Sequence, residues 1–185
     1  MRAVLAASGT PLAAPSANRS GEASPTTAGH VAMSLAGRIG MVLDGGACAT
    51  GLESTIVALR PDGWQVLRPG PVTTEAIAGV LDEAELGTAS PGIEAPGQLA
   101  SHYAPGKPVR LGAGAAQPDE FLIGFGALAG DVNLSAGGDL AEAASRLYTC
   151  LHMAAAAPQP RIAVAAIPGE GIGAAINDRL RRAAA

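Results

Sequence analysis

The stretch that organises this chain reads Pro15-Ser16-Ala17-Asn18-Arg19-Ser20-Gly21-Glu22-Ala23-Ser24-Pro25-Thr26, a loop crowded with hydroxyl, amide and guanidinium groups. A short apolar segment, residues 11–14, leads into it, and a helical pattern over 27–35 follows it. A buried strand that breaks into such a loop and restarts as a helix is a common frame for an anion, because backbone N–H groups at the turn point outward. We therefore expect a strand over 11–14 and an anion-binding loop after it.

The same loop admits a plainer interpretation, in which it only starts the helix that follows. Serine is a favoured N-cap residue and proline fits the first helical turn, so Ser24-Pro25-Thr26 could be ordinary capping chemistry. The loop alone does not decide between capping and anion binding, and the downstream residues have to.

The composition predicts a core built mainly from aliphatic side chains. Its 185 residues suffice for one domain or two small ones, and 48% are hydrophobic while 3% are aromatic. A net charge of −4 argues against a broad basic face for nucleic acid. Cys48 and Cys150 match no metal or redox spacing, which favours two reduced thiols. No apolar run reaches the roughly 18 residues of a membrane span, so we expect a cytoplasmic protein without membrane contact.

Strand and helix patterns alternate along the chain and predict the α/β class. Residues 1–8 have the pattern of a helix end that feeds a strand directly, which indicates that part of the fold lies upstream of Met1. A turn at 61–63 joins two strand patterns into a predicted hairpin, and beyond residue 109 the alternation favours right-handed crossovers. We expect strands over residues 40–44, 56–59, 64–68, 109–111, 121–125, 131–134 and 161–167, and helices over 28–35, 74–81, 139–153 and 174–185.

Periodicity disappears over residues 87–108, which are rich in proline, glycine, serine and alanine. A stretch about 20 residues long without a pattern indicates an interdomain linker or a functional loop. A flexible tether gains nothing from His102 beside Tyr103, so we expect this part of the segment to be docked onto the rest of the protein.

Three polar clusters lie at the ends of predicted strands, where open α/β sheets place ligands: the 16–26 loop, Glu53-Ser54-Thr55 and Arg68. Separately, Ser54 and Thr55 could cap a strand end, and Arg68 could form a surface ion pair of little value. Together they supply hydroxyl donors and a guanidinium suited to phosphate.

No nucleophile with a base accompanies these groups. The three histidines are far apart in the sequence, and neither a Ser-His-Asp order nor a carboxylate pair can be argued. Arg179, with Arg181 and Arg182, is expected to interact with the negative end of the last helix's dipole. The predicted chemistry is binding and positioning around a charged group.

Several motifs in series resemble the threonylcarbamoyl-AMP synthase family in its long, two-domain form. The resemblance covers nearly the whole chain in order, which makes it far more specific than any single loop. The motifs similar to the family's YrdC-type domain are Leu12–Gly21, Ser24–Thr26, Leu43–Gly46, Gly51–Val57 and Leu67–Gly70. Those similar to its linker and C-terminal domain are Ser101–Pro105 and Ala174–Leu180.

The resemblance implies an α/β fold in three parts. These are the C-terminal half of a YrdC-like twisted sheet domain over 1–86, a linker over 87–108 and a small Rossmann-like α/β domain over 109–185. The family's first domain begins much earlier, with strands that bear lysine and arginine groups for the triphosphate. The resemblance therefore implies an N-terminally truncated chain with little or no activity alone.

Members of this family condense L-threonine, bicarbonate and ATP into threonylcarbamoyl-AMP and release pyrophosphate, which serves the t6A modification of tRNA. The resemblance thus implies a nucleotidyltransferase in which Mg²⁺ offsets the triphosphate charge. It also implies two sets of site residues: Ser16, Ser24, Arg68, His102 and Tyr103 for ATP, and Ala14 and Ser54 for threonine. Tyr103 and His102 would lie where the linker folds over the active site.

Two other hypotheses stay open. A non-catalytic RNA-binding or regulatory YrdC-like module would contact tRNA or tRNA-modifying proteins, with steeply salt-dependent binding. A fragment with an open sheet edge would not fold stably, and it would lack a cooperative unfolding transition.

Overall fold

Four parallel strands form a sheet in the second half of the chain. The structure is a computed structural model, and it describes residues 2–81 and 92–185. The strands are β3 (Val109–Ala113), β4 (Glu120–Gly124), β5 (Val132–Asn133) and β6 (Arg161–Ala165), arranged in the order β3-β6-β4-β5. This sheet confirms the predicted α/β class and the parallel arrangement, with β6 inside the sheet as its continuous apolar sequence indicates.

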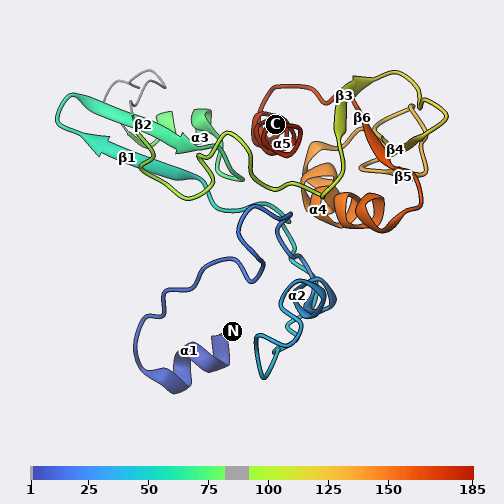
Figure 1. Cartoon of the computed structure of the whole chain (residues 1–185). Helices are drawn as coiled ribbons and strands as arrows, with labels where there is room; N and C mark the ends of the chain where they lie inside the picture. The colour runs from blue at the N-terminus through green and yellow to red at the C-terminus, as the bar shows by residue number, and fades with distance from the viewer. Residues whose placement is uncertain (1, 82–91) are drawn as a thin grey trace.

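Two helices cover one face of this sheet (Figure 1). These are α4 (Leu140–Ala156) and α5 (Ile172–Ala183), which pack against each other, α4 also against β4 and α5 against β3. Their apolar sides and the sheet enclose the main core, since Leu147, Leu151 and Ile176 are fully buried. The core is built from aliphatic side chains with Tyr103, Phe121 and Tyr148 among them, in keeping with the few aromatics in the sequence.

A separate antiparallel hairpin precedes this layer. It pairs β1 (Ile56–Arg60) with β2 (Gly63–Arg68), as predicted. Trp64 is buried, whereas Leu59, its partner across the hairpin, is 70% exposed. The helix that follows, α3 (Thr74–Ala78), is shorter than the predicted 74–81, because the chain leaves the helix at Gly79.

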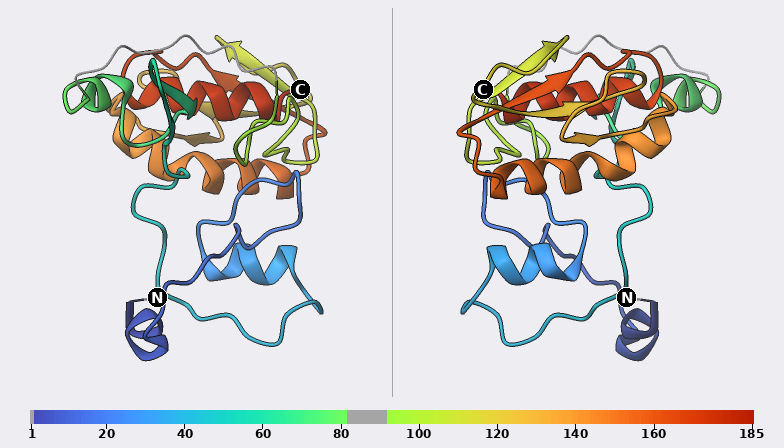
Figure 2. Two further views of the ribbon diagram at one scale, coloured as in Figure 1. Left: turned by 90° about the vertical axis from the view of Figure 1, so that its left-hand side faces the viewer. Right: turned by 90° about the vertical axis from the view of Figure 1, so that its right-hand side faces the viewer.

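The chain over residues 2–50 carries two short helices and extends away from the rest, except where residues 22–26 pack against the linker and α4 (Figure 2). The two helices are α1 (Arg2–Ser8) and α2 (Ala28–Ser34). The strands predicted over 11–14 and 40–44 are wrong: both segments are irregular, and Leu12 is 47%, Met41 77% and Leu43 69% exposed. An apolar run becomes a strand only where a neighbouring strand accepts its hydrogen bonds, and within the described residues none lies beside either segment.

The capping interpretation of Ser24-Pro25-Thr26 is also wrong. The N-cap of α2 is Thr27, whose hydroxyl accepts a hydrogen bond from the backbone N–H of His30 at 3.3 Å. Ser24 is therefore free to use its hydroxyl elsewhere.

The two halves of the chain are packed together. Gly51, at φ 77°, lies so close to α4 that a Cβ there would be 2.5 Å from the carbonyl oxygen of Ala144. The predicted linker is docked as expected in its described part, since the Ala104 N–H donates to Gly21 O at 2.8 Å and the His102 N–H donates to Arg182 O at 3.1 Å. Its first residues, 87–91, lie outside the described residues, as does the predicted domain end at residue 86.

Within residues 2–81 and 92–185, no helix combines the length and the hydropathy that crossing a membrane requires.

Candidate functional site

The carboxylate of Glu53, which is 18% exposed, joins the loop after residue 15 to both C-terminal helices. The Ser24 hydroxyl donates to Glu53 Oε1 at 2.5 Å. The Tyr148 hydroxyl, on α4, donates to Oε2 at 3.0 Å, and Arg179 Nε, on α5, donates to the same oxygen at 2.9 Å. Three segments that are distant in sequence therefore converge on one side chain.

Arg179 is the most deeply buried charge of this cluster. It is 0% exposed, and its Nη1 donates to Asp178 Oδ2 at 2.7 Å. Its guanidinium carbon also lies 5.3 Å from the centre of the Tyr103 ring, a cation–π contact. The expectation that Arg179 serves the dipole at the end of α5 is wrong, because only Arg181 and Arg182 occupy the last turn.

The surroundings keep Glu53 ionised. Burial, the largest effect, acts to raise its pKa, but the hydrogen bond from Ser24 and the charge and hydrogen bond of Arg179 lower the pKa below its ordinary value. Burial, and then the charge of Glu53, raise the pKa of Tyr148, so that its hydroxyl keeps its hydrogen. Glu53 is therefore an acceptor for all three partners.

Arg68, the last residue of β2, is held by backbone oxygens. Its Nε and Nη2 donate to Ser54 O at 3.1 and 2.8 Å, and Nη2 also lies 3.3 Å from Ser54 Oγ. Its Nη1 donates to Pro96 O at 3.3 Å, and the residue is only 8% exposed. The plain surface ion pair considered for Arg68 is therefore wrong, and Arg68 and Ser54 are direct neighbours.

Tyr103 connects Arg68 with the Glu53 cluster. A Cβ on Gly97 would overlap the Tyr103 hydroxyl and lie 3.3 Å from Arg68 Cδ, so both side chains flank this glycine. Tyr103 is 2% exposed and adopts φ 63°, a backbone conformation that is strained for a non-glycine residue. The His102 ring lies edge-on to it at 4.1 Å between centroids, and burial, the largest effect, lowers the pKa of His102.

The structure thus brings five of the seven predicted site residues into one region, namely Ser24, Ser54, Arg68, His102 and Tyr103. Ala14 and Ser16 lie elsewhere and are exposed. Ser16 borders a different hollow, of about 200 Å³, together with Thr26, Val42 and Cys48. The sequence pattern grouped Ser16 with Arg68, whereas in the structure Ser16 borders a hollow that Arg68 does not line.

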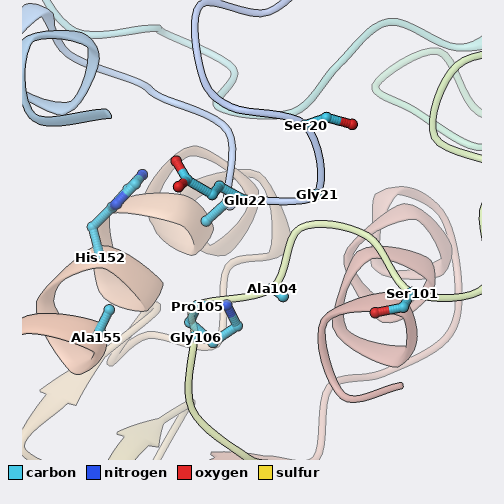
Figure 3. Close-up of a pocket in the computed structure, with 10 residues that line it drawn as sticks. Ser20, Gly21, Glu22, Ser101, Ala104, Pro105, Gly106, His152 and Ala155 are labelled. Atoms are coloured by element: carbon cyan, nitrogen blue, oxygen red, sulfur yellow. The ribbon is translucent and has the colours of Figure 1, made fainter. Parts of the chain in front are cut away.

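Another hollow, of about 440 Å³, lies between the loop and the docked linker (Figure 3). Glu22, Ala104 and His152 line it, and His152 Nε2 lies 3.1 Å from Ser24 O. The His152 ring also packs at 4.0 Å between centroids from that of His30, whose pKa is lowered by burial first and then by the charge of His152. These contacts hold the Ser24 backbone against α4.

Sequence reasoning missed Glu53, Tyr148 and Arg179 as a unit. Glu53 was recognised only as part of a polar cluster with Ser54 and Thr55, and Arg179 only as one of several basic residues. Two features of the sequence could have indicated this unit. Glu53 is a charged residue that directly precedes a strand pattern, and the pair Asp178-Arg179 lies between apolar residues of the last helix.

No metal site is formed by the protein over residues 2–81 and 92–185, where no three His, Cys, Asp or Glu side chains gather closely enough to hold an ion. Both cysteines are free, Cys48 exposed and Cys150 buried.

The ion pair between Arg179 and Glu53 joins a parallel α/β layer to a polar loop, and comparison with known families identifies a protein of this kind. Residues 72–185 match the family "Threonylcarbamoyl-AMP synthase, C-terminal domain", and residues 1–70 match the family "Telomere recombination". The chain belongs to the threonylcarbamoyl-AMP synthase family, as its motifs predicted.

Individual relatives agree. Threonylcarbamoyl-AMP synthase of Bacillus subtilis is 34% identical over 98% of this chain and 59% of its own length. The Pyrococcus abyssi protein of the same name is 32% identical over 94% of this chain and 57% of its own. The chain therefore spans 57% to 59% of the length of these two curated relatives.

Solved structures show the same fold. The crystal structure of P. abyssi Sua5 complexed with L-threonine matches with a TM-score of 0.84 and 30% identity, over 98% of this chain and 60% of that one. A variant of P. abyssi Sua5, with a histidine and the tyrosine after it both replaced by alanine, matches with a TM-score of 0.81 and 28% identity. His102-Tyr103 is the one His-Tyr dipeptide in the present sequence.

Proposed function

We propose that this chain contributes to L-threonylcarbamoyladenylate synthesis, in which ATP, L-threonine and bicarbonate give threonylcarbamoyl-AMP and pyrophosphate for the t6A modification of tRNA. The family membership supports this reaction, as does the complex of the P. abyssi relative with L-threonine. The single observation that carries it is the direct contact between Arg68, proposed for ATP, and Ser54, proposed for threonine.

The proposed roles follow that contact. Ser16, Ser24, Arg68, His102 and Tyr103 would contact ATP, and Ala14 and Ser54 would line the threonine pocket. The chain would be divided into a partial YrdC-like domain over 1–86, a linker over 87–108 and a C-terminal α/β domain over 109–185. Tyr103, held beneath Arg179, would present the linker to the nucleotide.

The chemistry assigned to these residues is positioning. The N-carboxylated threonine would attack the α-phosphate of ATP, and pyrophosphate would leave. Arg68 has five N–H groups, of which the bonds to Ser54 and Pro96 use at most four, so at least one can contact a phosphate oxygen. A buried guanidinium in a fixed orientation stabilises developing phosphate charge without reorganising during the reaction.

Mg²⁺ is proposed only as part of the nucleotide substrate. The described residues offer no cluster of ligands for it, so the triphosphate oxygens would carry the ion into the site. We further propose that the chain acts in the cytoplasm as a nucleotidyltransferase, with tRNA-modifying proteins or tRNA as its partners. The two free thiols agree with a reducing compartment.

ATP titration by calorimetry tests the proposal. Arg68→Ala should lower the affinity for ATP at least tenfold, because charge-assisted bonds to phosphate are among the strong ones. Arg60→Ala is the matched control. This substitution removes the same charge, but Arg60 pairs with Glu94 at 2.6 Å, away from the proposed site. Equal ATP affinity in all three proteins contradicts the proposal.

Turnover by this polypeptide alone should be far below that of the B. subtilis relative. Ala14 and Ser16 are exposed, and the hollow that Ser16 borders is not lined by Arg68, so we expect these residues to build only part of a closed site. Pyrophosphate release that depends on threonine and bicarbonate measures this, and a rate equal to that of the relative overturns it.

A further inference from the structure

The hydrogen of the Ser24 hydroxyl has a fixed direction in this protein. An ionised carboxylate accepts hydrogen bonds and donates none. The 2.5 Å contact between Ser24 Oγ and Glu53 Oε1 therefore places the serine hydrogen between the two oxygens. A serine hydroxyl has one hydrogen and two lone pairs, so only lone pairs remain for any other partner.

Two residues of the C-terminal helices keep Glu53 in that state. Arg179 Nε and the Tyr148 hydroxyl both donate to Oε2, since the guanidinium has only donors and the phenol keeps its hydrogen. A protonated Glu53 could keep the same contacts only by donating from Oε1 to Ser24. The positive charge of Arg179, 2.9 Å from Oε2, favours the ionised form, in which the Ser24 hydroxyl is the donor.

We infer that Arg179 and Tyr148 act as positioning residues which hold Glu53 as an acceptor, so that Ser24 meets a bound nucleotide through its lone pairs and recognises a hydroxyl or amino group of the nucleoside. The inference rests on the proposed function for the placement of a nucleotide at Ser24. It changes the role expected from the sequence, in which the loop hydroxyls donate to phosphate.

The chemistry of the ligand separates these roles. The triphosphate oxygens are acceptors, and they would meet the Ser24 lone pairs without a hydrogen between them. The ribose hydroxyls and the amino group of adenine are donors, so they complement an acceptor. The phosphate contacts then belong to Arg68, whose guanidinium is a donor only.

The first test needs no ligand. In uniformly ¹³C-labelled full-length chain, the Glu53 carboxyl should titrate below its ordinary pKa, and it should titrate at a higher pH in Ser24→Ala and in Tyr148→Phe, which keeps the buried ring. The Ser24 hydroxyl proton should exchange slowly and show a through-space contact to Glu53. Titration of Glu53 at its ordinary value, or a Ser24 proton directed away from it, overturns the inference.

The second test compares ligands that differ by one group. The probes are adenosine, 2′-deoxyadenosine, 3′-deoxyadenosine, purine riboside, which lacks the amino group, and inorganic tripolyphosphate. One of the three altered nucleosides should bind about tenfold more weakly than adenosine, and Ser24→Ala should abolish that difference. If all three bind as adenosine does, the inference is overturned.

A third test replaces the hydrogen-bond acceptor that faces Ser24 by a donor. In Glu53→Gln, the amide N–H₂ can donate to Ser24 and turn its hydrogen toward the ligand. The variant should gain severalfold in affinity for tripolyphosphate and lose the discrimination among nucleosides. Failure of every nucleoside to bind contradicts the proposed function, and the carboxyl titration then decides the direction of the Ser24 hydrogen by itself.

Discussion

Carboxylate side chains are buried in this protein where hydrogen-bond donors reach both of their oxygens. Glu120, at the start of β4, is 4% exposed, and Arg110 donates to it from Nε at 2.8 Å and from Nη2 at 2.6 Å. The Gln117 N–H adds a bond of 2.8 Å. The bonds from Arg110, the largest effect, outweigh the cost of burial and lower the pKa of Glu120 from 4.5 to about 2.

This pKa predicts how stability depends on pH. The folded-state pKa lies below the unfolded value, so ionised Glu120 stabilises the fold above pH 4.5, and the contribution disappears as the pH falls toward about 2. Glu120→Gln should lower the free energy of unfolding at pH 7 and change it little at the acid end. Urea unfolding at both pH values measures this.

The neighbouring Asp119 provides the control. Its side chain is 47% exposed and lies 3.7 Å from Arg161, so Asp119→Asn should have little effect at either pH. An equal loss in Glu120→Gln at neutral and acid pH contradicts the assignment.

At the scale of single residues, the sequence predicted polar groups correctly but not their partners. The 16–26 loop, Glu53-Ser54-Thr55 and Arg68 were grouped because each was expected at a strand end. The structure places Ser24 near Ser54 and Arg68 but leaves Ser16 beside a different hollow. Arg179 was misassigned because a basic residue near a helix end has an ordinary local explanation, and its burial depends on Glu53, 126 positions away. No local pattern contains that information.

At the scale of elements, α4 supports the site because it carries Tyr148. Its N-cap is Asp139, whose carboxylate accepts from the Glu142 N–H at 2.7 Å. Asp139→Ala should lower the free energy of unfolding by about 1 kcal/mol, and Asp139→Asn, which keeps an acceptor, should cost far less. Chemical unfolding compares the two, and equal losses would show that the cap is unimportant.

Elements were predictable where local sequence and tertiary partners agree. The β1–β2 hairpin needs only the turn at 61–63 and its own two strands, so its pattern sufficed. The strand over residues 161–167 was recognised because it is apolar throughout, and the structure buries β6 between β3 and β4. Residues 40–44 have a similar pattern but no adjacent strand in the described part of the chain, and the prediction failed there.

At the scale of the whole molecule, the contact between residue 51 and α4 holds the two halves together. Gly51→Ala would place a Cβ 2.5 Å from Ala144 O and 2.6 Å from Ser145 Cα, in addition to the strain of φ 77°. We expect a loss of more than about 2 kcal/mol in unfolding free energy, together with weaker ATP binding.

Gly46→Ala isolates the backbone-strain part of this loss. Gly46 has φ 84°, but a Cβ there would meet nothing within 4 Å. It should cost about 1 kcal/mol from backbone strain and leave ATP binding intact. Thermal unfolding and calorimetry on both variants provide the comparison, and similar behaviour of the two would contradict a role for the close approach to α4.

The central claim is that Ser24, Glu53, Arg68 and Tyr103 border one nucleotide site, which the C-terminal helices complete. Mapping of NMR chemical-shift changes on the ¹⁵N- and ¹³C-labelled chain during ATP titration tests it most directly. The account predicts that the largest saturable changes fall on these four residues and on Ser54. Changes confined to the hollow beside Ser16, or to the one lined by Glu22 and His152, would contradict it.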